Sequence, residues 1–158
     1  MDQIEEHISI SGKWPLSAYT WKTERFLDRF TANLAKKKIF GARCSNCGTV
    51  FVPPVVVCTR CHSRMSLDKD QDWIWVSDMG TVIAYSISYL AVGDGLQARA
   101  PEKRPLFILV HLDGTDTDIF AELIDTVEEK IKVGMRVQVA WSEVPKGDLS
   151  DILFFRSL

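Results

Sequence analysis

The arrangement of apolar and polar positions divides the chain into three zones, and the first zone predicts a helix. Residues 18–38 contain neither Pro nor Gly, and bulky apolar side chains recur at helical spacing from Trp21 to Ala35. This periodicity predicts an amphipathic helix within an N-terminal arm, residues 1–38. Its apolar stripe would pack on the chain's own core or cover a partner subunit, and the sequence leaves both open.

The third zone, residues 71–158, is all-β by pattern. The turn signal at residues 113–116 predicts a hairpin, and residues 91–105, with two Gly and two Pro, predict a long loop. Several short strands without intervening helices favour a small Greek-key barrel of the OB-fold type. The predicted strands cover residues 72–76, 80–89, 106–112, 119–124, 135–141 and 152–155.

The middle zone, residues 39–70, contains the four cysteines of the chain, Cys44, Cys47, Cys58 and Cys61. They form two Cys-x-x-Cys pairs, and four sulfurs in a tetrahedron are what a structural Zn²⁺ prefers. Gly48 follows the first pair, where a knuckle needs a residue that tolerates positive φ. The β-branched residues of 49–57 predict short strands with a bend at the Pro pair, which together describe a zinc ribbon.

Other chemistries fit the cysteines less well. Cys58 to His62 matches a c-type haem motif, but that chemistry requires export, and the N-terminus does not resemble a signal peptide. Disulfides are disfavoured for the same reason, and a redox pair would need a βαβ context. Iron could occupy the same four-sulfur cage. His62 could replace one cysteine, although four available sulfurs make it a neighbour rather than a ligand.

Composition predicts a soluble protein, and its charges are unevenly placed. The chain is 46% hydrophobic and 25% charged. Because no apolar run approaches about 18 residues, we expect no transmembrane helix and a cytoplasmic location. Residues 1–70 carry 11 Lys and Arg against 7 Asp and Glu, whereas residues 71–158 carry 8 against 14.

The order of the motifs resembles a known family. Two Cys-x-x-Cys knuckles flank a Pro-Pro bend, and the segments Gly-Thr-Val-Ile-Ala-Tyr-Ser (80–86) and Ile-Lys-Val-Gly-Met-Arg-Val (131–137) follow. Over residues 20–158 this order resembles the zinc-ribbon OB-fold family associated with acyl-CoA metabolism. The resemblance implies a mainly β chain with an N-terminal helical arm, in which a rubredoxin-like zinc ribbon (39–70) precedes an OB-fold barrel (71–158).

The resemblance also implies a role. Members of this family are small partner subunits of thiolases and related condensing enzymes, among them the small subunit of the benzoylsuccinyl-CoA thiolase. Their OB domain helps to bind or channel the acyl-CoA. The resemblance therefore implies a non-catalytic subunit of a thiolase-type acyltransferase complex, a hetero-oligomer with acyl-CoA as shared ligand. Nothing in the sequence selects the acyl group.

The residues independently argue against catalysis by the isolated chain. A thiolase-type reaction needs a cysteine nucleophile and a histidine base. Every cysteine is assigned to the metal, so His7, His62 and His111 have no free cysteine partner. A Gly-x-Ser-x-Gly elbow is absent from the sequence, and four thiolates would close the coordination sphere of the metal.

Binding of CoA phosphates requires cations, and two groups of basic residues are candidates. One lies where the helix meets the ribbon, and the other lies in the predicted loop. A lysine run at a helix end is also explained as a solvated terminus that complements the helix dipole. The candidates are Lys36, Lys37, Lys38 and Arg43 in the first group and Arg99, Lys103 and Arg104 in the second.

A nucleic-acid-binding module is the alternative function. Zinc ribbons and OB-folds both bind nucleic acids, and the five Trp could stack on bases. The acidic balance of residues 71–158 disfavours a phosphate-binding groove. Trp73, Trp75 and Trp141 lie in strand patterns, where burial is the usual outcome. We therefore expect neither a nucleic-acid nor a membrane partner.

Overall fold

The structure, a computed structural model, describes residues 25–66, 70–92, 96–100 and 103–158. The described residues include 25–38 of the stretch that predicted a helix, and helix α1 covers Arg25–Leu34 before a turn at residues 35–37. Phe30 and Leu34 are fully buried in the main apolar cluster, so this stripe packs on the chain's own core. The described helices include none long and apolar enough to cross a membrane.

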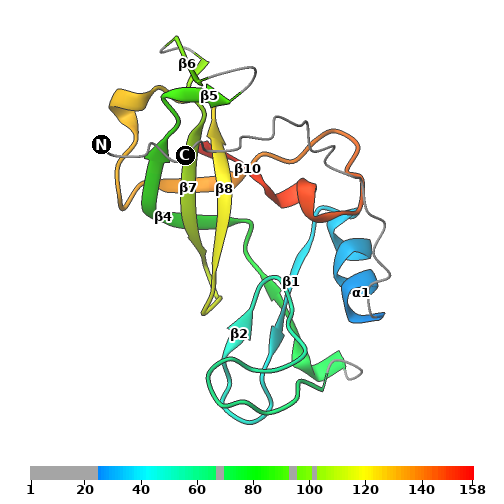
Figure 1. Cartoon of the computed structure of the whole chain (residues 1–158). Helices are drawn as coiled ribbons and strands as arrows, with labels where there is room; N and C mark the ends of the chain where they lie inside the picture. The colour runs from blue at the N-terminus through cyan, green and yellow to red at the C-terminus, as the bar shows by residue number, and fades with distance from the viewer. Residues whose placement is uncertain (1–24, 67–69, 93–95, 101–102) are drawn as a thin grey trace, which may run out of the picture.

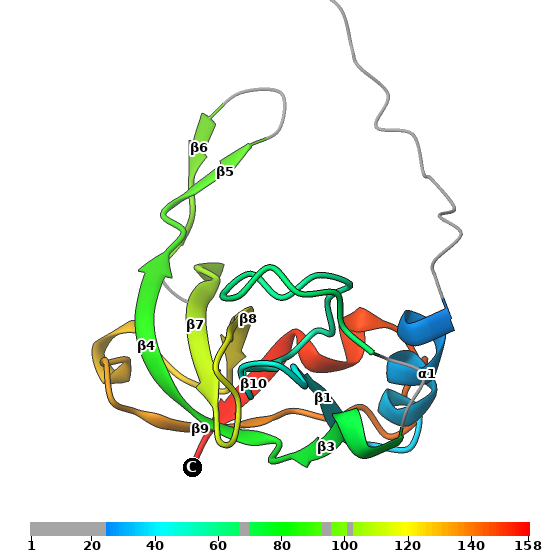
Figure 2. The same ribbon diagram turned by 90° about the horizontal axis from the view of Figure 1, so that it is seen from below.

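A three-stranded sheet forms the ribbon, with β1 (Ile39–Arg43) between β2 (Val50–Phe51) and β3 (Trp73–Val76). Figure 1 labels β1 and β2, and Figure 2 labels β1 and β3. We expected residues 72–76 to begin the barrel. Instead β3 runs antiparallel to β1, with Ile39 opposite Val76, because β1 has an edge that β2 leaves unpaired. Trp73 is buried, as expected, but Trp75 is 69% exposed because it points from the outer side of this edge strand.

Five strands close into a barrel in the order β10-β8-β7-β4-β9. Inward positions alternate along β7 and β8, and their side chains fill the interior together with Phe155. At Gly80 the β4 backbone passes so close to β7 that a Cβ would lie 2.5 Å from the carbonyl oxygen of His111. The strands are β4 (Met79–Ile87), β7 (Leu106–Leu112), β8 (Asp118–Ile124), β9 (Arg136–Val139) and β10 (Phe154–Ser157).

The connections contain short 3-10 helices and one projecting hairpin. Residues 91–105 were expected to form a loop, but β5 (Leu90–Val92) and β6 (Leu96–Ala98) pair with each other there. Figure 2 shows the β5–β6 hairpin projecting from one end of the barrel. The 3-10 helices are η1 (Asp70–Asp72), η3 (Glu128–Lys130) and η4 (Leu149–Ile152).

The turn between β7 and β8 joins the barrel to the ribbon. The predicted hairpin is present, with Leu106 opposite Leu123 and His111 opposite Asp118. Beyond closing the hairpin, the turn binds the β2 segment. The backbone N–H of Val50 donates to Asp116 Oδ2 at 2.8 Å. Thr117 Oγ1 accepts from the N–H of Val52 at 2.9 Å and donates to its carbonyl at 3.0 Å.

Candidate metal centre

The two Cys-x-x-Cys pairs form knuckles with the same backbone hydrogen bonds. The N–H of Gly48 donates to the carbonyl of Cys44 at 2.8 Å, and the N–H of His62 donates to the carbonyl of Cys58 at 2.9 Å. Gly48 has φ 79° and His62 has φ 60°. Each knuckle therefore needs a left-handed residue directly after its second cysteine, which the sequence indicated only at Gly48.

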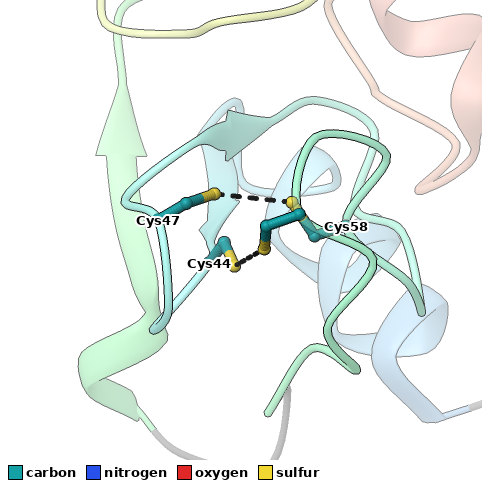
Figure 3. Close-up of side chains that lie close together, drawn as sticks. Cys44, Cys47 and Cys58 are labelled. Carbon is teal, nitrogen blue, oxygen red and sulfur yellow. Dashed lines mark hydrogen bonds between the residues drawn. The ribbon is translucent and has the colours of Figure 1, made fainter.

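These two turns bring four sulfurs together. The Sγ atoms of the two pairs all lie within 4.8 Å of one another. Cys44 Sγ is 3.6 Å from Cys61 Sγ, and Cys47 Sγ is 3.6 Å from Cys58 Sγ (Figure 3). Four sulfurs at about 2.3 Å from one Zn²⁺ would be about 3.8 Å apart, so the cluster fits a tetrahedral zinc. All four cysteines are free thiols rather than disulfides.

The pKa values of the thiols differ because their surroundings differ. The hydrogen bond with Ser63 lowers the pKa of Cys44 and, more strongly, lowers that of Cys61 to about 5. Burial raises the pKa of Cys58 to about 11. A metal ion would bind two thiols that are inclined to ionise and would have to displace a proton from Cys58.

Two hydroxyl groups support the sulfurs, and the sequence analysis did not identify them. Ser63 Oγ lies 3.3 Å from Cys44 Sγ and 3.0 Å from Cys61 Sγ. Thr49 Oγ1 lies 3.1 Å from Cys47 Sγ. Both hydroxyl residues directly follow the left-handed position of their knuckle, and this repeat is the signal that could have revealed them.

The histidines lie apart from the sulfurs. His62 is exposed and does not belong to the group of described residues that could hold the metal, as expected for a neighbour. His111 lies on the outer side of β7, where its Nδ1 is 2.8 Å from Asp118 Oδ1. His7 lies outside the described residues.

The candidate CoA-binding cations do not form one site. Lys36, Lys37 and Lys38 are exposed in the turn after α1, and Arg43 Nη2 donates to the Gln71 carbonyl at 3.3 Å. Arg99, Lys103 and Arg104 instead lie at the base of the β5–β6 hairpin. The two views place that hairpin far from α1 (Figures 1 and 2).

Among the seven candidate cations, Arg104 is the one that pairs with a carboxylate in the described residues. Its Nη1 donates to the Glu128 carboxylate at 3.0 Å and 3.1 Å, and its guanidinium lies 4.6 Å from the centre of the Tyr89 ring. Arg99 Nε donates to the Leu90 carbonyl at 3.0 Å, whereas Lys103 is exposed. Arg104 therefore braces the hairpin against η3, which the sequence did not indicate.

Comparison with known proteins places the chain in a family. Residues 33–68 match the rubredoxin-like zinc ribbon domain of ChsH2, and residues 73–142 match the C-terminal OB-fold domain of ChsH2. The two matches follow each other and cover more than half of the chain. The chain therefore belongs to the ChsH2 family of zinc-ribbon OB-fold proteins, as its motifs predicted.

Individual relatives agree with this assignment. A DUF35 domain-containing scaffold protein of Methanocaldococcus jannaschii is 26% identical over 106 residues, covering 67% of this chain and 69% of the relative. The fold matches a chain of the Ltp2-ChsH2(DUF35) aldolase with TM-score 0.58 and 22% identity, over 87% of this chain and 98% of that one. A DUF35 protein of unknown function from Sulfolobus solfataricus matches with TM-score 0.63 and 20% identity, over 86% and 87%.

Proposed function

We propose that the chain is a non-catalytic subunit of a thiolase or related acyl-CoA condensing or cleaving enzyme, and that it stabilises the complex and completes its acyl-CoA site. One observation carries the proposal: the chain's four thiols lie within 4.8 Å of one another in the ribbon. As ligands of a structural zinc, Cys44, Cys47, Cys58 and Cys61 leave no thiol to attack an acyl group. The nucleophile must then come from another chain.

The relatives support the same role. One is named a scaffold protein, and another is a chain of an aldolase whose name joins Ltp2 to ChsH2. Both descriptions suit a protein that works beside an enzyme. The cytoplasmic location expected from the sequence forms part of this proposal.

Co-expression tests the proposal directly. The chain should be produced with a thiolase-family enzyme of the same organism, and the mixture analysed by size-exclusion chromatography with light scattering. We expect a hetero-oligomer, and we expect thiolytic cleavage of acyl-CoA only when both chains are present. Two separate species together with full activity of the enzyme alone would contradict it. A panel of acyl-CoA substrates given to the complex would then identify the acyl group.

The CoA contacts need a separate experiment because the two groups of cations are far apart. In the assembled complex, Lys36, Lys37 and Lys38 can be replaced together by Gln, and Arg99 and Lys103 can be replaced together by Gln. The group that meets the CoA phosphates should raise the KM for acyl-CoA by about tenfold with little change in kcat. An unchanged KM in both variants would remove these residues from the acyl-CoA site.

A further inference from the structure

The outer face of the barrel carries an apolar patch where three strands meet. Glu122 on β8 lies opposite Phe107 on β7 and opposite Phe154 on β10, so these three side chains share one row of the outer face. Phe120 stacks on Phe107, with ring centroids 5.4 Å apart and planes 22° from parallel. With Leu153 they line a depression of about 150 Å³. We call these five residues the aromatic-carboxylate patch.

The patch is exposed although its chemistry is that of an interior. Phe120 is 62% exposed, Phe154 42% and Leu153 41%. Ala121 and Leu123, which alternate with Phe120 and Glu122 along β8, are buried in the barrel. An antiparallel strand with one face to water normally places polar residues on that face. Aromatic residues clustered there indicate a surface that binds another molecule.

Glu122 gives the patch a charge that no other described residue balances. Glu122 is one of the residues that line the depression, and among the described residues no cation or hydrogen-bond donor pairs with its side chain. A half-buried carboxylate beside apolar groups is stabilised by a partner cation. The stacked rings of Phe107 and Phe120 also attract a cation to their faces. Both features favour a positively charged ligand group with an apolar stem.

The same charge argues against a second copy of this chain as the occupant. A two-fold dimer over this face would bring the patch against itself, because such an interface is self-complementary. Glu122 would then meet Glu122 of the copy, and like charges in a desolvated interface are costly. A different chain with the opposite charge avoids that repulsion.

We propose that the aromatic-carboxylate patch is the surface that docks the catalytic partner subunit, and that it receives an Arg side chain of that subunit surrounded by apolar residues. The guanidinium plane binds the Glu122 carboxylate through two N–H donors and stacks on an aromatic face, which an ammonium group does less well. Arg and aromatic residues are also enriched where binding energy concentrates in interfaces. The inference rests on the proposed function, since it names where that subunit binds.

Three variants test the surface in the full chain, with the thiolase-family enzyme of the co-expression experiment as the binding partner. Phe120→Ser should weaken the Kd by about 30-fold or more, because it removes an exposed anchor of the interface. Glu122→Lys should weaken it by about 100-fold, because it opposes the partner's cation. Glu122→Gln keeps the shape and should cost about tenfold, and its Kd should depend less on salt.

Matched controls lie on exposed surface elsewhere. Glu129→Gln neutralises an exposed acid on η3, and Val144→Ser removes an apolar side chain that is 82% exposed. Both should bind within twofold of the unaltered chain. Thermal unfolding and zinc content of each free variant show that the fold is intact, and Glu122→Gln keeps the test valid if Phe120→Ser folds poorly.

The outcomes distinguish a failure of the proposed docking surface from a failure of the proposed function. If the unaltered chain binds the enzyme and all three variants bind equally well, the surface is wrong and the proposed function stands. If the unaltered chain does not bind, both proposals are overturned. If sedimentation shows the free chain to be a dimer that Phe120→Ser dissociates, the occupant is a second copy and the inference is also overturned.

Discussion

The ribbon and the barrel are stabilised in different ways within one short chain. Among the described residues, the separate apolar cluster of the ribbon has five buried members, and two of these are Cys44 and Cys58. The cluster that fills the barrel has twenty, and it extends to α1 and to one side of the ribbon through Ile39, Val50, Val52, Trp73 and Val76. A module with so little apolar burial depends on metal coordination, whereas the barrel depends on packing. The comparison predicts which changes unfold one region and spare the other.

Metal removal should have the largest effect, and this effect should fall on the ribbon and on the β7–β8 turn that is bonded to it. A strong chelator, or the double change Cys58→Ser and Cys61→Ser, would remove coordination that contributes on the order of 10 kcal/mol in small zinc modules. We expect amide-exchange protection to disappear from β2 and both knuckles and to persist in β7 and β8. Hydrogen exchange with zinc quantification measures this.

The matched control for the cysteine variants is Ser45→Ala, an exposed position between the two cysteines of the first knuckle. It should retain one equivalent of zinc and the exchange pattern of the unaltered chain. Equal loss of protection in ribbon and barrel after chelation would contradict the division of the chain into a metal-dependent and a packing-dependent region.

A cavity in the barrel should destabilise the barrel and leave the metal site of the ribbon intact. Leu112 is fully buried, and Leu112→Ala should lower the free energy of unfolding by about 2–5 kcal/mol. Zinc content at room temperature should be unchanged. Denaturant titration gives the stability, and Val144→Ala on the surface should change it by less than about 0.5 kcal/mol. Loss of zinc in Leu112→Ala would show that the barrel core also supports the knuckles.

The hydrogen bonds that link the two regions should contribute less to the free energy of unfolding than the metal site or the barrel core. Thr117→Val preserves shape but leaves the N–H and carbonyl of buried Val52 without their partner, at a cost of about 1–3 kcal/mol. We also expect chelation to reduce exchange protection at the β7–β8 turn in the unaltered chain and to do so less in the variant. Thr126→Val, which removes an exposed hydroxyl contact, is the control.

The two knuckles differ at their left-handed position, and exchanging residue types tests that difference. A residue other than glycine costs about 1–2 kcal/mol in this conformation, so Gly48→Ala should destabilise the first knuckle. No clash with the rest of the protein adds to this cost, since a Cβ at Gly48 would have no atom within 4 Å beyond its chain neighbours. His62→Gly should strengthen the second knuckle by up to about 1 kcal/mol. Competition with a zinc-binding dye ranks the variants, and identical zinc affinities would contradict the prediction.

The smallest effect concerns pH and the barrel surface. Arg136 Nη1 donates to Asp113 Oδ1 at 2.7 Å, and this hydrogen bond lowers the pKa of Asp113. A lowered folded-state pKa stabilises the protein above the unfolded value of about 3.9, and that stability is lost as pH falls through the folded-state pKa. Because the pair is partly exposed, we expect at most about 1 kcal/mol. Asp113→Asn should reduce the difference in stability between pH 6 and pH 3, and an unchanged difference would remove the pair from the pH response.

Much of the fold could be predicted because it depends on local signals. Alternation on residues 106–112 and 119–124 identified the central hairpin, and the turn residues between them fixed its position. The spacing of the cysteines predicted the sulfur cluster, and the motif order predicted a rubredoxin-like ribbon and an OB-fold barrel. The aromatic-carboxylate patch had a weaker signal in the outward positions Phe107 and Phe120, where polar residues were expected.

The structure differs from the sequence-based predictions where the outcome depends on pairing between segments. The apolar run at residues 73–76 fits either sheet, and only the free edge of β1 decided that it joins the ribbon. The glycines and prolines of residues 91–105 predicted a loop, although a pairing between β5 and β6 forms there. Arg104 stays a candidate for contact with a CoA phosphate, and no local signal indicated that Glu128, 24 positions away, pairs with it.

The sequence by itself determined most of the helix and strand positions and the cluster of four sulfurs, since hydrophobic periodicity and a fixed Cys-x-x-Cys spacing act over a few residues. The tertiary structure decided which elements contact one another and which side chains are exposed. It joined the β7–β8 turn to Val50 and Val52, separated the two groups of cations, and exposed Phe120 while burying its neighbours on β8. These outcomes depend on contacts between residues distant in the chain, which no local pattern encodes.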